Sequence, residues 1–254
     1  IADKPTLLLI DDLWNLQQLD LLRQVPAAAV VFSTRQPRLA NAELVQQSYR
    51  LKGLSESAAL DVIQHFSGQL PPDLREISRS LVNTYDCLPL WLQLIGRHMR
   101  RVGYDGQHTR VSETLKRLIA NARLRLDLGS EAQALSSLRA CIDLSVGALD
   151  AQTRQALHDI ATLAPKPNSF SREAFLAITR CDVECLYDLV DVGLISGAQG
   201  RDRYALHASI RDYLTITDTG ADRGERLQRL VEYYCTVAPH LGAHDMSFEA
   251  ENLT

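Results

Sequence analysis

The sequence contains no long hydrophobic run and no excess of basic residues. No apolar segment approaches the roughly 20 residues needed to span a bilayer, so we expect no membrane partner. Its 254 residues carry a formal net charge of −4, from 27 Lys and Arg against 31 Asp and Glu. This balance argues against a mainly electrostatic partnership with nucleic acid or with an anionic membrane.

Cysteines are also sparse and odd in number: Cys87, Cys141, Cys181, Cys185 and Cys235. Such a pattern does not indicate a disulfide framework, so we expect reduced thiols and a cytoplasmic location. Cys181 and Cys185 share a four-residue spacing that could bind a metal, but no partnering pair lies nearby, which favours core thiols. The chain starts with Ile1 and reaches an apolar segment within six residues, so we expect it to be part of a longer protein.

The most informative segment is a short apolar run that ends in two carboxylates, Asp11 and Asp12. A continuous run such as Leu7–Ile10 predicts a strand covered on both faces in a parallel sheet. Ligands bind beyond the carboxyl ends of such strands. In P-loop NTPases a carboxylate here holds Mg²⁺, and a second can orient the attacking water. The alternative is a strand end whose charges are merely solvated.

A second apolar run, 27–32, ends in Ser33, Thr34 and Arg35. A helical stripe lies between the two runs, so a right-handed βαβ unit with parallel strands is predicted. Both polar ends would then meet at one sheet edge, where a hydroxyl and a guanidinium could sense a terminal phosphate. Arg35 could instead simply pair with Asp12. A further short edge strand is expected over 45–51.

From Leu54 onward the periodicity is helical, and it predicts a bundle over 53–130. Ser55 is placed as an N-cap, and Pro89 falls in the first turn of a helix. A linker is expected over 129–134. Three helices and a β-hairpin (193–196 with 203–206) then predict a winged helix within 131–217, and residues 218–254 read as the start of a helical, repeat-like region. The fold class is therefore α/β plus mainly α.

The order of these segments resembles the NB-ARC or STAND class of signalling ATPases. The resemblance rests on five motifs, namely LLLIDDLW (7–14), VFSTR (31–35), YRLKGLS (49–55), CLPL (87–90) and LHASIRDY (206–213). It covers roughly residues 5 to 216. It implies that 1–52 is the C-terminal part of a P-loop NTPase sheet, followed by the bundle, the winged helix and a sensor region.

The resemblance also implies roles for single residues. Asp11 would hold Mg²⁺ and Asp12 would act in hydrolysis. Arg35, within a sensor motif that includes Thr34, would sense the γ-phosphate. Pro89 would pack on the adenine of ADP or ATP, and His207 would reach the β-phosphate of ADP.

What the resemblance implies for the intact protein is a resting state bound to ADP, opening on exchange for ATP, self-association, and slow ATP hydrolysis. An unknown protein or small molecule would act as the trigger at the C-terminal helical region.

The chain departs from the family at three points. Cys87 replaces a glycine, which is tolerable if the backbone there is helical, and Ala208 and Ser209 follow His207 where Asp is common. No G-x-x-x-x-G-K-[ST] sequence occurs, so we expect the phosphate loop upstream of Ile1 and little nucleotide binding by this segment alone.

Two other functions remain open. A winged helix could bind DNA, but its recognition helix, about 182–192, carries four acids and no Lys or Arg, which would repel phosphates. The chain could also be a scaffold that has kept the architecture and lost the nucleotide cycle, with His207 as an ordinary structural residue.

Overall fold

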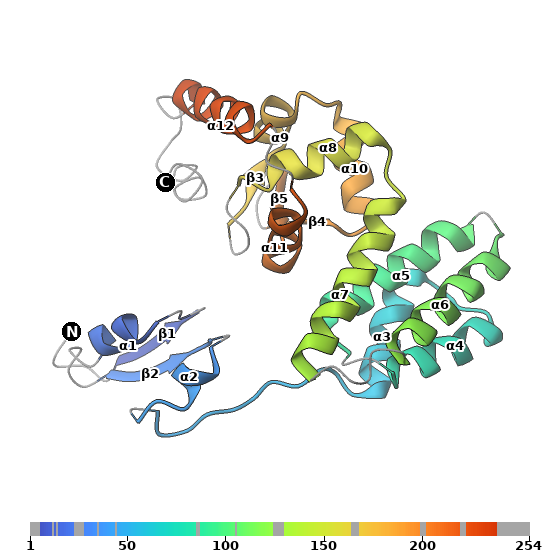
Figure 1. Cartoon of the computed structure of the whole chain (residues 1–254), viewed down its shortest axis with the longest axis horizontal. Coiled ribbons are helices and arrows are strands. Elements are labelled where there is room, and N and C mark those ends of the chain that lie inside the picture. Colours follow the sequence, from blue (N-terminus) through green and yellow to red (C-terminus); the bar gives the residue numbers. More distant parts are fainter. Residues whose placement is uncertain are drawn as a thin grey trace. The chain divides into compact units, whose positions relative to one another are not determined.

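A computed structural model describes residues 6–11, 13, 15–22, 28–34, 36–43, 45–84, 87–104, 106–123, 130–163, 168–198, 202–218 and 222–237. The chain divides into two compact units, Ile1–Lys52 and Gly53–Thr254. Helices predominate and the sheets are small (Figure 1), so the class is α/β plus helical, as expected.

The first unit contains β1 (Thr6–Ile10), α1 (Leu16–Leu22), β2 (Ala28–Phe32) and α2 (Pro37–Ala40). The strands are parallel, with Leu8 opposite Val30, which confirms the predicted βαβ unit. Leu13, Leu19 and Leu39 form a small buried core against Ile10 and Phe32.

Two expectations for this unit are wrong. Leu7, Leu9 and Val31 are 58%, 73% and 58% exposed, so one sheet face is not covered by the described residues. Alternate residues of a strand point to opposite faces, and the helices pack on the other one. Residues 45–51 are irregular rather than a strand. Tyr49 and Leu51, at 79% and 94% exposed, gain too little burial to hold the segment in a sheet.

The second unit begins with the four predicted helices, α3 (Glu56–Ser67), α4 (Pro72–Val82), α5 (Pro89–Tyr104) and α6 (His108–Arg123). The Ser55 hydroxyl accepts a hydrogen bond from the Ala58 N–H, so Ser55 is the N-cap of α3. Pro89 is the first residue of α5, as predicted, where its missing N–H leaves no helical bond unmade.

The rest of this unit combines helices with a three-stranded sheet. Its helices are α7 (Ser130–Gly147), α8 (Ala151–Ile160), α9 (Arg172–Thr179), α10 (Val183–Asp191), α11 (Ala208–Thr217) and α12 (Arg223–Val237). The sheet, of order β3-β5-β4, is antiparallel and consists of β3 (Phe170–Ser171), β4 (Ile195–Gly197) and β5 (Arg203–Leu206). The predicted hairpin is confirmed. The two-residue strand β3 was not predicted, because it is too short to show a period.

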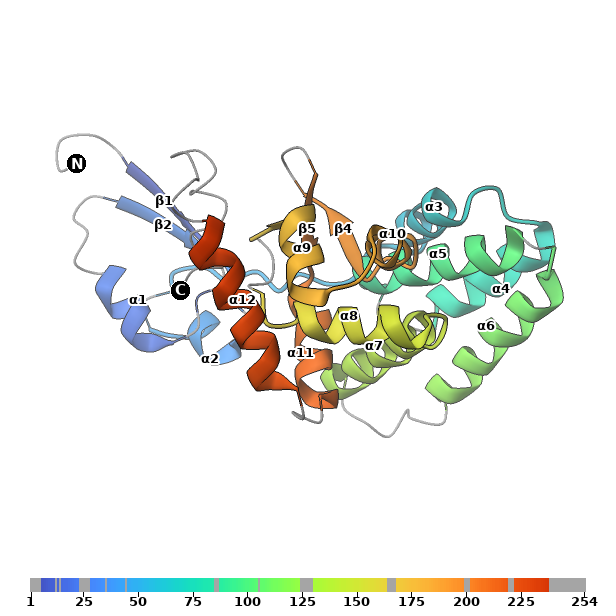
Figure 2. The same cartoon turned by 90° about the horizontal axis from the view of Figure 1, so that it is seen from above.

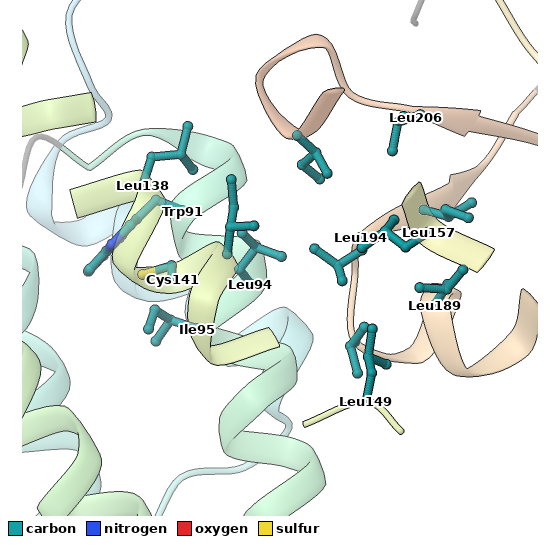
Figure 3. Close-up of a cluster of buried hydrophobic side chains, with 14 of the residues drawn as sticks. Trp91, Leu94, Ile95, Leu138, Cys141, Leu149, Leu157, Leu189, Leu194 and Leu206 are labelled. Atoms are coloured by element: carbon teal, nitrogen blue, oxygen red, sulfur yellow. The ribbon is translucent and has the colours of Figure 1, made fainter. Parts of the chain in front are cut away.

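The linker expected over 129–134 is wrong, because α7 begins at Ser130. The residues that follow include Glu131, Ala132, Gln133 and Ala134, which are favourable helix formers. α7 packs against α5 through Trp91 and Cys141, which are 2% and 1% exposed (Figure 3).

One continuous apolar core runs through the second unit. In Figure 3 the α5–α7 residues lie on one side, while Leu157, Leu189, Leu194 and Leu206 come from the α8–β5 part. The red helix α12 packs against α9 (Figure 2). Arg226 and Tyr234 of α12 are 2% and 4% exposed, so this helix is anchored by buried side chains.

Candidate nucleotide and metal site

The carboxyl ends of β1 and β2 are joined by hydrogen bonds. The Ser33 N–H donates to the Ile10 carbonyl (2.9 Å), and the Leu13 N–H donates to the Ser33 carbonyl (2.8 Å). In addition, the Ser33 hydroxyl donates to Oδ1 of Asp11. Asp11 and Ser33 are both exposed, so this carboxylate and hydroxyl face solvent at the sheet edge.

Thr34 has a different role at the same edge of the sheet. Its hydroxyl donates to the Leu13 carbonyl (2.7 Å) and accepts from the Gln36 N–H (3.0 Å). The hydroxyl proton is therefore used to fix the loop. Ser33, which the sequence analysis did not single out as a site residue, is the hydroxyl that meets Asp11. Its position directly after β2, in register with the end of β1, was the available signal.

Asp12 and Arg35 lie outside the described residues. The roles assigned to them therefore remain predictions.

The Asp11 carboxylate suits Mg²⁺ as a ligand. Mg²⁺ is usually held by one or two carboxylates together with water and substrate phosphates, rather than by a cage of protein groups. Among the described residues no group of three or more His, Cys, Asp or Glu side chains could hold a metal. A single exposed carboxylate beside a hydroxyl fits a magnesium ion that is held by one carboxylate together with water and substrate phosphates.

Cys87 and Pro89 lie in the second unit, where a tight turn leads into α5. Cys87 has φ +50°, in the left-handed region, so the condition under which cysteine was expected to replace glycine here, a helical backbone, is not met. The conformation is held because the Cys87 carbonyl accepts from the Leu54 N–H (3.1 Å) and its thiol donates to the Val82 carbonyl (3.2 Å). The Pro89 ring is exposed and could cover a flat ligand ring.

His207 lies between β5 and α11 and is the N-cap of α11. Its Nδ1 accepts a hydrogen bond from the Ser209 N–H at 3.1 Å. In a neutral ring this bond requires the proton on Nε2, because only the unprotonated nitrogen can accept. The half-buried imidazole is thereby fixed in orientation and in tautomer, with Nε2–H as its donor.

Asp11 and Thr34 thus share a sheet edge in one unit, while Pro89 and His207 belong to different elements of the other.

α10 has the acidic surface predicted from its sequence. Asp182, Glu184, Asp188 and Asp191 are all exposed. The helix contains no Lys or Arg. Its surface therefore offers phosphates no favourable charge, which weighs against a DNA interface at α10.

A comparison with models of known protein families found no match, and a comparison with curated proteins found no matching protein. Among the helices that the structure describes, none combines the length and apolar character needed to cross a membrane.

Proposed function

We propose that this chain is part of a nucleotide-dependent molecular switch of the NB-ARC or STAND class. The observation that carries the proposal is the hydrogen bond between Ser33 and Asp11, at the shared carboxyl edge of two parallel strands. A carboxylate at this edge, next to Ser33 and Thr34 of the sensor-like segment, is the arrangement that a Walker B strand and its neighbour require.

In this proposal Asp11 holds Mg²⁺, which would neutralise phosphate charge when bound. The Ser33 hydroxyl orients the Asp11 carboxylate. Asp12 would act in hydrolysis and Arg35 would sense the γ-phosphate. Thr34 would support the loop rather than contact the nucleotide.

Two features of the second unit support the same function. Cys87, which stands where the family has glycine, has a left-handed backbone of the kind that glycine adopts without strain, and Pro89 begins α5 two residues later and is exposed. The Nε2–H of His207 would donate to the β-phosphate of ADP, while its Nδ1 caps α11. We also propose that the helices and sheet of 131–217 form a winged helix.

The nucleotide cycle would be the one that the resemblance implies. It would take place in the cytoplasm. ADP would keep the switch closed, and exchange for ATP would release the winged helix and permit self-association. A trigger would act on the region 218–254. The phosphate loop that this cycle needs does not occur in these 254 residues.

The first experiment purifies a protein in which a phosphate loop and its strand precede Ile1, denatures it, and identifies the released nucleotide by chromatography. Stoichiometric ADP is the expected result, whereas residues 1–254 alone should release little. A folded protein that carries the loop and releases no nucleotide would instead indicate a scaffold without a nucleotide cycle.

The role of His207 can be separated from its capping role with two variants. His207→Ala removes both the cap and the Nε2 donor, while His207→Asn keeps a good N-cap and removes the donor. Both should raise ATP occupancy or self-association if Nε2 contacts the phosphate. An ADP-bound monomer with His207→Asn would contradict this role.

A further inference from the structure

The long helix α7 packs with the bundle rather than with the elements that follow it. It lies against α5 and α6, and its Cys141 is buried beside Trp91 of α5 (Figure 3). Helices α8, α9 and α10 pack among themselves and against strands of the β3-β5-β4 sheet. Among the described elements, no helix of α3–α7 packs broadly against α8–α12. The second unit therefore contains two groups of elements, a first part (α3–α7) and a second part (α8–α12).

Residues 148–150 link the two parts and lie outside both neighbouring helices, between the end of α7 and the start of α8. Each part holds one carbonyl of this link. Arg101 of α5 donates to the Ala148 carbonyl at 3.1 Å, and Arg154 of α8 donates to the Leu149 carbonyl at 3.0 Å. Leu149 is 5% exposed and lies in the apolar core that both parts share. The link is therefore short and is fixed to both parts.

Away from the link, hydrogen bonds from side chains bridge the two parts. Arg97 of α5 donates to the Val190 carbonyl at the end of α10, at 2.8 Å. Tyr213 of α11 donates to Asp143 of α7, and the Arg139 guanidinium lies 5.9 Å from the centre of the Tyr213 ring. Such bonds contribute modestly, because the same groups can bond to water when the parts separate. Relative motion is the usual behaviour where two parts share no broad apolar surface.

We propose that residues 148–150 are a hinge, and that Arg97 and Tyr213 form a clasp that selects one arrangement of the two parts. Hinges in proteins are a few residues at the ends of elements that absorb the change in backbone angles. With the clasp released, the link and the core around Leu149 still connect the parts, but other arrangements become populated. The clasp contains no residue assigned to nucleotide binding, so this proposal does not depend on the nucleotide cycle.

The test measures a distance between the two parts in the folded chain by double electron–electron resonance. One spin label is attached to Cys235 of α12, which is exposed, and the other to α6 through Lys116→Cys, also at an exposed position. Cys181→Ser removes a half-buried thiol that would compete for the label, and the other three cysteines are buried. We expect a single narrow distribution of distances in this background.

Arg97→Met and Tyr213→Phe remove the two donors of the clasp and keep most of the apolar bulk. Together they should broaden the distribution and add distances that the background lacks. Arg100→Met is the matched control, because it removes an exposed guanidinium one turn further along the same helix and should leave the distribution narrow. A folded double variant with a distribution as narrow as that of Arg100→Met would overturn the proposal.

A second measurement needs no substitution and decides the matter if the double variant does not fold. Native-state hydrogen exchange separates groups of amides that open together from groups that open at a different free energy. We expect the amides of α3–α7 and those of α8–α12 to form two such groups. One shared opening for both parts would contradict the hinge.

Discussion

The Arg97 guanidinium on α5 donates a hydrogen bond of 2.8 Å to the Val190 carbonyl near the end of α10. The same side chain packs over the Phe66 ring, 5.2 Å from its centroid. A cation at a helix C-terminus also interacts favourably with the helix dipole. Gly193 makes the approach possible, because a Cβ at Gly193 would lie 2.6 Å from Cδ of Arg97.

Gly193→Ala should therefore destabilise the second unit by more than the backbone strain of an alanine at this position. Gly193 has φ +82°, which costs an L side chain about 1 kcal/mol, and displacing Arg97 adds about 1–2 kcal/mol. Gly106→Ala is the control, since Gly106 has φ +71° and open space around a Cβ. Urea unfolding should show a larger loss for Gly193→Ala. Equal losses in the free energy of unfolding would mean that the Arg97 side chain moves aside without destabilising the fold.

The left-handed backbone of Cys87 predicts an unusual order of substitutions. Both Cys87→Ala and Cys87→Gly lose the buried thiol and its bond to Val82, but only glycine is unstrained at φ +50°. Cys87→Gly should therefore be more stable than Cys87→Ala by about 1 kcal/mol. Denaturant unfolding of the two variants tests this, and the reverse order would show that the turn relaxes in the alanine variant.

A buried ionic cluster anchors α12 to α8. Asp159 is 3% exposed and accepts from Arg229 at 2.9 Å, while Arg226 lies 4.0 Å from it. Arg226 also donates to the His158 carbonyl at 3.1 Å and pairs with Asp218. Asp159→Asn keeps the shape but removes the charge between two guanidiniums, so we expect a loss of about 3 kcal/mol.

The control for Asp159→Asn is the exposed pair of Arg117 and Glu113, 3.5 Å apart, where Glu113→Gln should cost less than about 0.5 kcal/mol. Hydrogen exchange should localise the Asp159→Asn effect to α12. A loss as small as that of Glu113→Gln would show that α12 is held by its apolar contacts alone.

Tyr213 links α11 to α7, since its hydroxyl donates to Asp143. Burial, followed by the hydrogen bond to this carboxylate and its charge, raises the pKa of Tyr213 to about 12. The folded state therefore keeps the phenol proton at a pH where the unfolded chain, with a pKa near 10, has lost it. By linkage, the free energy of unfolding should fall as pH rises between about 10 and 12.

Tyr213→Phe should flatten this alkaline slope and, at neutral pH, cost about 1 kcal/mol for the lost hydrogen bond to Asp143. Absorbance titration of the phenols and urea unfolding across the pH series provide the two measurements. An unchanged slope in Tyr213→Phe would assign the alkaline loss to other groups.

The local elements follow from the sequence alone. Ser55 caps the helix that it was expected to cap, since an N-cap bond spans only three residues. The parallel pairing of β1 and β2 followed from two apolar runs and a helix between them, which placed Asp11 and Ser33 at one edge before their hydrogen bond was seen.

How those elements pack depends on contacts between residues that are far apart in the chain. Leu7 and Leu9 are exposed on the sheet, whereas leucines of the same hydrophobicity are buried in the core. The packing of the folded chain makes this difference. The left-handed φ of Cys87 is held by hydrogen bonds to Leu54 and Val82. The hydrogen bond from Arg97 to Val190 joins residues that are 93 positions apart in the sequence. Periodicity reports on neighbours within a few residues, whereas these contacts depend on which surfaces meet after the chain has folded.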